Sequence, residues 1–270
     1  MATVAAKTDP SVPPREPRRA KTLARMDRIF FSAMAILFLG IVLIGFAQTY
    51  FLAEFVPHPH WKRAFAGPHP LIVHVHGAVL TSWFLLLVMQ TRLVATRHVR
   101  LHRRLGYIGM GVAALVVLVG FLVVCEHLSR AFPIGDNKIV TSGGNLAVLF
   151  DVLIFGVLVS LAYIYRNNSA AHKRLILIGS IAILPPAIAR SSAFILHHFW
   201  LAAVGIAYSL ILIIAIYDLI SRRRLHPATI GGGLFYFLLM NVWVSQALAA
   251  NRGWWFNLAL QAQALGRHLY

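Results

Sequence analysis

Seven long apolar runs constrain this 270-residue chain more than any other feature. They cover residues 29–53, 70–96, 105–127, 144–166, 173–196, 199–220 and 228–249. A helix needs about 20 apolar residues to cross the hydrocarbon core of a bilayer, and it satisfies its own backbone there. Only 12% of the residues are charged, about half the share of a soluble domain. The sequence therefore predicts an all-α fold, a polytopic membrane helical bundle of about seven transmembrane helices.

The lysines and arginines indicate how this bundle is oriented. Segments 1–28, 92–104, 165–174 and 221–227 hold seven, five, three and three of the 25 basic residues. The segments on the opposite side hold six, and Arg190 lies within a run. Because Lys and Arg accumulate in cytoplasmic segments, the N-terminus is predicted inside and the C-terminus outside.

The net charge of +17 is explained by these short clusters between apolar runs. No aromatic-basic reading motif accompanies them, so the sequence predicts no nucleic-acid partner. The predicted partner is the lipid bilayer, and partners within a larger membrane complex are compatible with the pattern.

The pattern divides the chain into three regions. Residues 1–28 are polar, basic and proline-rich, which predicts a disordered cytoplasmic arm. The seven-helix transmembrane domain follows over 29–249, and its first run is too long for a signal peptide, which predicts a retained anchor. Residues 250–270 contain Trp254 and Trp255 near their start, typical of an interfacial tail. Cys125 is the single cysteine, which excludes an intrachain disulfide.

Two short segments are similar to each other. LHRRLGYIG (101–109) and AHKRLILIG (171–179) share a histidine, basic residues, leucine, isoleucine and glycine. The similarity fits a duplicated helical hairpin, and it equally fits convergence, because helices that enter a membrane from the cytoplasm favour a basic start.

The segments HGAVLTSWFLLLVMQTRLVATRHVRLHRRLG and AHKRLILIGSIAILPPAIAR resemble a group of uncharacterised bacterial multi-pass inner-membrane proteins. The resemblance covers residues 76 to about 198. It implies a multi-pass protein of the bacterial inner (cytoplasmic) membrane, and it implies no activity.

Two ionisable residues stand out deep within predicted spans. Asp151 and Arg190 each lie about 10 Å from the outer end of a helix, and consecutive helices are antiparallel neighbours. The spacing therefore predicts an ion pair between them. Such a pair either locks two helices together or marks a functional site.

Polar residues also gather toward the outer ends of the runs. His76, Trp83 and Gln90 share one stripe of their helix at intervals of seven, which favours His76 over His74 as the inward-facing residue. Pro185 and Pro186 predict a kink, which would make their helix one wall of an outward-facing pocket. The predicted pocket residues are His74, Trp83, Gln90, Glu126, His127 and His198.

Three classes of function stay open at this point. Haem b is a possible cofactor, because bundle helices present axial histidines to it. His76 and His197 are the candidate ligands on the outer side, and His102 and His172 on the inner side. A metal-dependent oxygenase or hydrolase is a second class, although HVH and HH match no familiar histidine box. The third class needs no cofactor: a transporter, an assembly factor or an accessory subunit of a membrane complex.

Overall fold

The computed structural model is helical wherever it has regular structure among the residues it describes. These residues are 18–52, 55, 71–131, 144–195, 199–249 and 254–269. The α-helices are α1 (Arg18–Phe46), α3 (Leu71–Ala95), α4 (Val99–Ala131), α6 (Gly144–Ile164), α7 (Ser169–Ala182), α8 (Pro185–Ile195), α9 (Phe199–Arg222), α10 (Pro227–Ala249) and α11 (Trp254–Leu269). A π-helical turn, η1 (Ala47–Phe51), extends α1.

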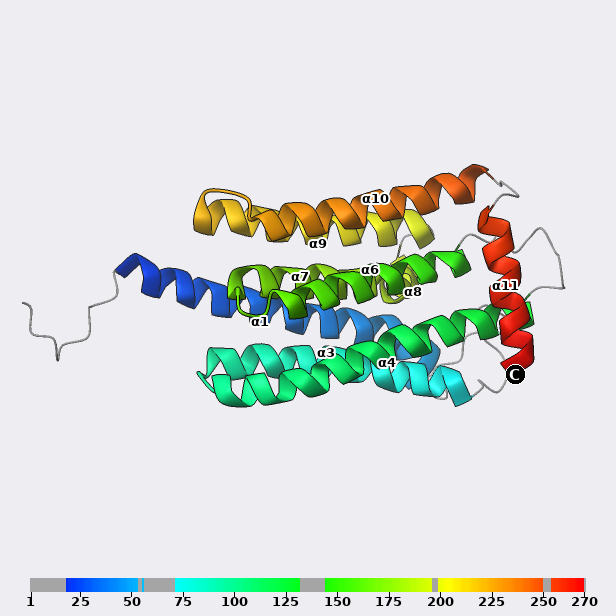
Figure 1. Ribbon diagram of the computed structural model, residues 1–270, viewed down its shortest axis with the longest axis horizontal. Coiled ribbons are helices and arrows are strands. Elements are labelled where there is room, and N and C mark those ends of the chain that lie inside the picture. Colours follow the sequence, from blue (N-terminus) through cyan, green and yellow to red (C-terminus); the bar gives the residue numbers. More distant parts are fainter. Residues whose placement is uncertain are drawn as a thin grey trace, which may run out of the picture.

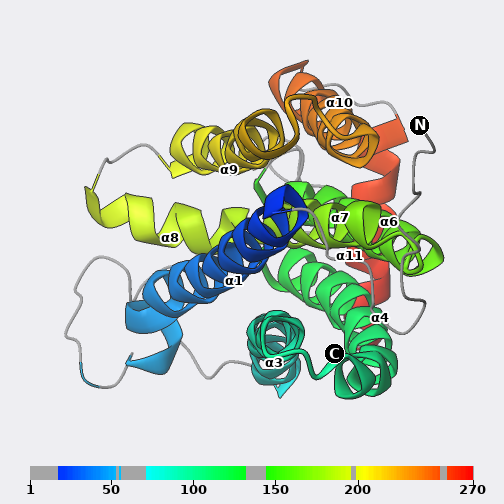
Figure 2. The same ribbon diagram turned by 90° about the vertical axis from the view of Figure 1, so that its left-hand side faces the viewer.

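The long helices lie side by side and run in alternate directions along the bundle (Figure 1). Seen from one end, α7 occupies the interior (Figure 2). It contacts α1, α6, α9 and α10, and most of its side chains are buried. In contrast, α11 crosses the far end of the bundle and packs against α4. The bundle is therefore built around α7.

Large apolar side chains cover the outside of the bundle as well as its core. Ile44 on α1, Leu118 on α4 and Ile220 on α9 are more than half exposed. Four described helices are long and apolar enough to cross a membrane, or five if α7 and α8 form one bent span. The shorter apolar stretches Val148–Ile164 and Pro227–Val242 accompany them. These apolar helices are compatible with an integral membrane protein.

The boundary expected at residue 29 is corrected by the structure, because α1 begins at Arg18. Arginine, lysine, leucine and methionine are good helix formers, so the helix continues past the apolar run into the basic segment. Asp27, in this added portion, is bonded to other helices. Residues 1–17 of the predicted arm lie outside the described residues, and most of the predicted tail is helix α11.

The kink expected at Pro185 and Pro186 is present as a full break between α7 and α8. The two helices meet at an angle of 51°, and Ile183 and Leu184 are not α-helical. Proline has no amide hydrogen to donate to the preceding turn, but it fits the first turn of a new helix. The proline pair therefore ends α7 and starts α8.

One close approach fixes α8 against α1. A Cβ atom on Gly45 would collide with the backbone carbonyl of Ala187, so only glycine permits this spacing. The next residue along α1 is Phe46 and the residue before Ala187 is Pro186, and both line the cavity described below.

Candidate functional site

A small cavity lies inside the bundle at the break between α7 and α8. Its volume is about 40 Å³, enough for one or two water molecules. Its lining residues are Phe46, His76, Leu80, Val116, Val148, Asp151, Val152, Ile183 and Pro186. Two ionisable side chains thus share a cavity whose other walls are apolar.

Asp151 is the acidic residue of this cavity. It projects from α6, its side chain is 2% exposed, and Oδ1 has no hydrogen-bond partner in the structure. The hydroxyl of Tyr236, on α10, is also buried without a partner and lies within electrostatic range of Asp151. A buried carboxylate without compensating donors has a high desolvation cost, so the ionised form of Asp151 is unfavourable at this position.

His76 is the second ionisable group, and the structure places it inward on α3. Its Nδ1 atom is buried without a hydrogen-bond partner, and the guanidinium of Arg190 lies within electrostatic range. His74 has a different environment: it is exposed and its Nδ1 bonds the hydroxyl of Tyr50 at 2.9 Å. Tyr50 belongs to η1, and π-helical turns are frequent near functional sites.

The ion pair predicted between Asp151 and Arg190 is not formed among the described salt bridges. The Nη1 atom of Arg190 donates to the carbonyl of Pro186 at 3.0 Å, and its guanidinium lies 4.6 Å from the Phe46 ring centroid. The prediction counted depth at 1.5 Å per residue and assumed that the segment with Arg190 runs parallel to the helix with Asp151. The 51° bend at the prolines invalidates that count.

The inward stripe of α3 continues from the cavity toward the other end of the bundle. Trp83 is buried, and its Nε1 donates to the Ser180 hydroxyl of α7 at 3.1 Å. Two turns further along, the Gln90 amide lies against His102 of α4, and it bonds His102 when its oxygen and nitrogen are exchanged. The three residues at intervals of seven therefore face the interior and contact different helices.

Gln90 belongs to a second polar centre, formed by two histidines. The ring centroids of His102 and His172 are 6.5 Å apart, with the ring planes at 85°. Nδ1 of His172 lies 2.8 Å from the carbonyl oxygen of Ala162. The similar segments found in the sequence therefore place their histidines together, on α4 and α7.

A third polar group lies at the same end and was not predicted as a site. Arg174 and Asp218 are completely buried and form a salt bridge. Asp218 Oδ2 also accepts from the Thr229 hydroxyl at 2.6 Å and from the His226 amide at 3.1 Å. The Nη1 atom of Arg174 donates to the carbonyl of Ala170 at 2.8 Å. Both charges are therefore well compensated, which is the requirement for burying an ion pair.

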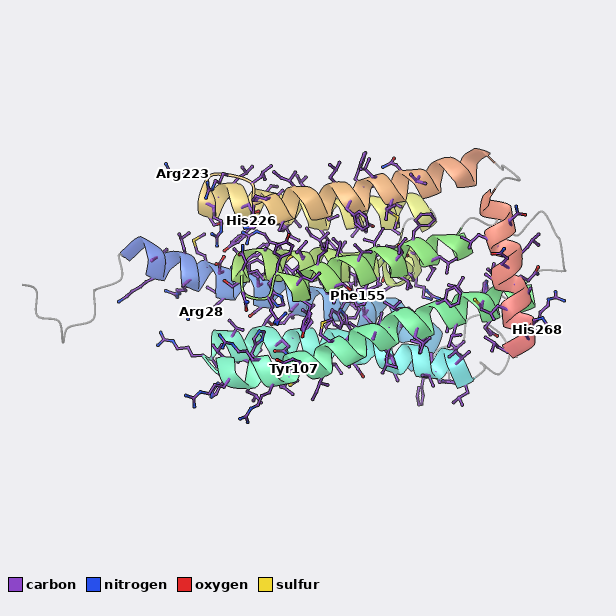
Figure 3. All side chains as sticks on the ribbon, viewed as in Figure 1. Arg28, Tyr107, Phe155, Arg223, His226 and His268 are labelled. Carbon is purple, nitrogen blue, oxygen red and sulfur yellow. The ribbon has the colours of Figure 1, made fainter. Side chains whose placement is uncertain are left out.

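Asp27 connects α1 to this end of the bundle. One oxygen forms salt bridges with Lys173 at 2.6 Å and with Arg222 at 3.3 Å, and the other accepts from the Tyr217 hydroxyl at 2.5 Å. Figure 3 shows Arg28, Arg223 and His226 at this same end, which we call the basic end. The acidic residues Asp27 and Asp218, next to basic clusters, were the sequence signal for this network.

Two other predicted pocket residues, Glu126 and His127, do not line the cavity. Glu126 is buried near the end of α4 and His127 is exposed, where the α11 residue Gln263 donates to the Leu128 carbonyl. His197 and His198 lie outside the described residues.

Within the described part of the chain, no group of three or more His, Cys, Asp or Glu side chains could hold a metal ion. No protein-family model, curated protein or solved structure matches the chain. Its own geometry is therefore the basis for a functional assignment.

Proposed function

We propose that this is a bacterial inner-membrane protein that transfers protons through its helical bundle, as a transporter of the proton-coupled class. The observation that carries the proposal is the uncompensated Asp151 carboxyl, which shares a water-sized cavity with His76 beside a broken helix. Ionisable residues within membrane helices are characteristic of proton and ion pathways.

The chemistry of the cavity supports protons over larger substrates. A volume of about 40 Å³ admits water but excludes an organic molecule or a porphyrin. Protonation of Asp151 removes a buried negative charge and its desolvation cost. Proton binding at Asp151 therefore changes the energy of a position where α6 faces the end of α7 and the start of α8.

The proposal includes seven spans, with the N-terminus in the cytoplasm and the C-terminus outside. The crossing segments are α1, α3, α4, α6, the bent pair α7–α8, α9 and α10. Their alternating direction and the gathering of basic residues at one end support this topology.

Accessibility of introduced cysteines in intact cells tests the topology, in a Cys125→Ala background. Cysteines at Thr141 and Asn251 are expected to react with a membrane-impermeant maleimide, and a cysteine at Ser169 is expected to stay unlabelled. Labelling at Ser169 in intact cells would contradict the proposed orientation.

Proton transfer is tested in liposomes that contain the purified protein and a pH-sensitive dye, with a potassium gradient and valinomycin as the driving force. Asp151→Asn is expected to lower the proton flux by at least about tenfold, because the amide has nearly the same shape but cannot exchange a proton. Ser160→Ala, an exposed position on the same helix, is the matched control. Equal flux in Asp151→Asn and wild type, or no flux in wild type, would refute the proposal.

A haem-binding redox protein is the second candidate, and one observation favours it. His102 on α4 and His172 on α7 would hold the haem, because their ring centroids are 6.5 Å apart and bundle cores present histidines to haem from facing helices. The outer ligand His76 fits this reading less well, since its cavity is too small for haem. Bound haem would supply one-electron chemistry, and oxidised and dithionite-reduced spectra of protein expressed with ample haem test for it. A colourless protein would eliminate this candidate.

A further inference from the structure

The histidine pair at the basic end has complementary hydrogen-bond environments. In the amide orientation that satisfies both of its polar atoms, the Gln90 nitrogen donates to His102 Nδ1 at 2.5 Å and to the His102 carbonyl at 3.2 Å. The Gln90 oxygen accepts from the Gly106 amide at 3.1 Å. In this amide orientation Nδ1 accepts a hydrogen bond, so neutral His102 carries its proton on Nε2.

His172 is held in the opposite tautomer. Its Nδ1 atom lies 2.8 Å from the Ala162 carbonyl oxygen, and a carbonyl can only accept. Nδ1 therefore carries the proton, and the Nε2 atom of neutral His172 is left with a lone pair. One ring of the pair offers a donor and the other offers an acceptor.

We propose that His102 and His172 form a proton-binding site, in which His172 Nε2 accepts a single proton and His102 stays neutral. This inference rests on the proposed function, and it makes the pair the site at which the proton path binds and releases protons at the basic end. The ring separation is too long for a direct N–H···N bond but suits one bridging water molecule. A hydronium ion gives up one O–H bond, an N–H bond forms at His172 Nε2, and His172 becomes an imidazolium. The reverse step releases the proton to water at the basic end.

The surrounding charges limit this site to one proton. Arg103 on α4 acts on His102, as does His172 itself. On α7, Lys173 and Arg174 follow His172 directly, but Asp27 and Asp218 compensate them. The charged groups of the described residues that act on His102 are all basic, so a second imidazolium beside the first would be repelled.

The site also continues the inward stripe of α3. Gln90 lies 14 residues from His76, about 21 Å along the helix, with the Trp83–Ser180 hydrogen bond between them. The cavity and the histidine pair are thus two proton-exchanging groups connected by one helix face. No other feature of the proposed function requires the Gln90 amide, which gives the inference a test of its own.

The test combines nitrogen-15 NMR of labelled histidine with the liposome flux assay. At neutral pH, His102 is expected as the Nε2–H tautomer and His172 as the Nδ1–H tautomer. Gln90→Glu replaces the amide donor with a carboxylate acceptor and is expected to move the His102 proton to Nδ1. His98→Gln, an exposed histidine bonded to Thr96 at the same end, is the matched control and identifies its own signal.

The two proposals fail separately. Identical tautomers for His102 and His172, or an unchanged His102 tautomer in Gln90→Glu, would overturn the inference. So would wild-type flux in His172→Asn while Asp151→Asn stops the flux, and in that case the proposed function stands. The expected result is a loss of flux of at least about tenfold in His172→Asn, with wild-type flux in His98→Gln. Tautomers as expected in a protein without proton flux would refute the proposed function and leave the proton-binding site in place.

Discussion

Two buried carboxyl groups of this bundle have opposite surroundings. Asp218 at the basic end bonds Arg174, the Thr229 hydroxyl and the His226 amide. Asp151 is equally inaccessible, yet its Oδ1 faces the cavity without a hydrogen-bond partner. The two residues have the same side chain and similar burial, so their difference isolates the effect of compensation.

The difference separates buried polar groups that stabilise the bundle from those that do not. A compensated buried charge holds helices in a defined relation, and removal of its partner is costly. An uncompensated carboxyl contributes nothing favourable to folding, because it loses its hydration without gaining a hydrogen bond. The bundle therefore contains one buried carboxyl held by partners at the basic end and one at the cavity that lacks them.

The same substitution at the two sites gives the largest expected effect and the sharpest contrast. Asp218→Leu should lower the free energy of unfolding by about 3–5 kcal/mol, because Arg174 is left buried without a counter-charge. Asp151→Leu should leave stability unchanged or raise it by about 1–3 kcal/mol, because an unsatisfied polar group is removed. Denaturant unfolding of the purified protein in detergent measures both.

A double change supplies the control for this contrast. Arg174→Met combined with Asp218→Leu should recover much of the loss, since neither charge then lacks its partner. If the single effects simply add in the double variant, or if both Asp→Leu variants lose stability equally, compensation is not what distinguishes the two sites.

The close contact between α1 and α8, beside the cavity, gives the next largest effect on stability. Gly45→Ala should cost about 1–3 kcal/mol, because the added methyl group collides with the Ala187 backbone and pushes α1 from α8. Gly40→Ala, on the same helix with nothing within 4 Å of the added atom, should be neutral or gain up to about 1 kcal/mol. Thermal unfolding of the two variants compares them, and equal melting temperatures would show that the close approach does not support the cavity wall.

The sequence predicts what depends on periodicity and misses what depends on tertiary geometry. Helix type follows from the apolar runs, and the interval of seven between His76, Trp83 and Gln90 identifies the inward face of α3. The predicted contact between Asp151 and Arg190 required the segment with Arg190 to run parallel to α6. The kink at the proline pair was predicted, but residue spacing alone does not give the angle of the bend or the position of Arg190 after it.

The basic-end network was missed for a different physical reason. Arg174 was counted only as an orienting charge, because a basic residue at a helix entrance normally contacts headgroups. Its burial depends on Asp218, which is 44 residues away and on another helix. Only the packing of α9 and α10 around α7 creates that partner.

The smallest expected effect is a pH dependence of stability that arises from His226, whose amide bonds Asp218. His226 lies in the turn between α9 and α10, and its Nδ1 accepts a hydrogen bond from the Ala228 amide at 3.1 Å. Burial, and next the positive charge of Arg174, lower the pKa of His226 below its ordinary value of 6.5. The unfolded chain therefore binds a proton more readily than the folded one, so this contribution to stability is present above pH 6.5 and declines as the pH falls through that value.

Acidification from about pH 7.5 to 5.5 should lower the free energy of unfolding by on the order of 0.5–1 kcal/mol through this residue, the size of one helix-cap bond. His226→Asn keeps an oxygen acceptor for the Ala228 amide but cannot titrate, so its stability should fall less with acidification than that of the wild type. Unfolding of both proteins across this pH range measures the difference, and parallel curves would show that protonation of His226 does not weaken the basic end.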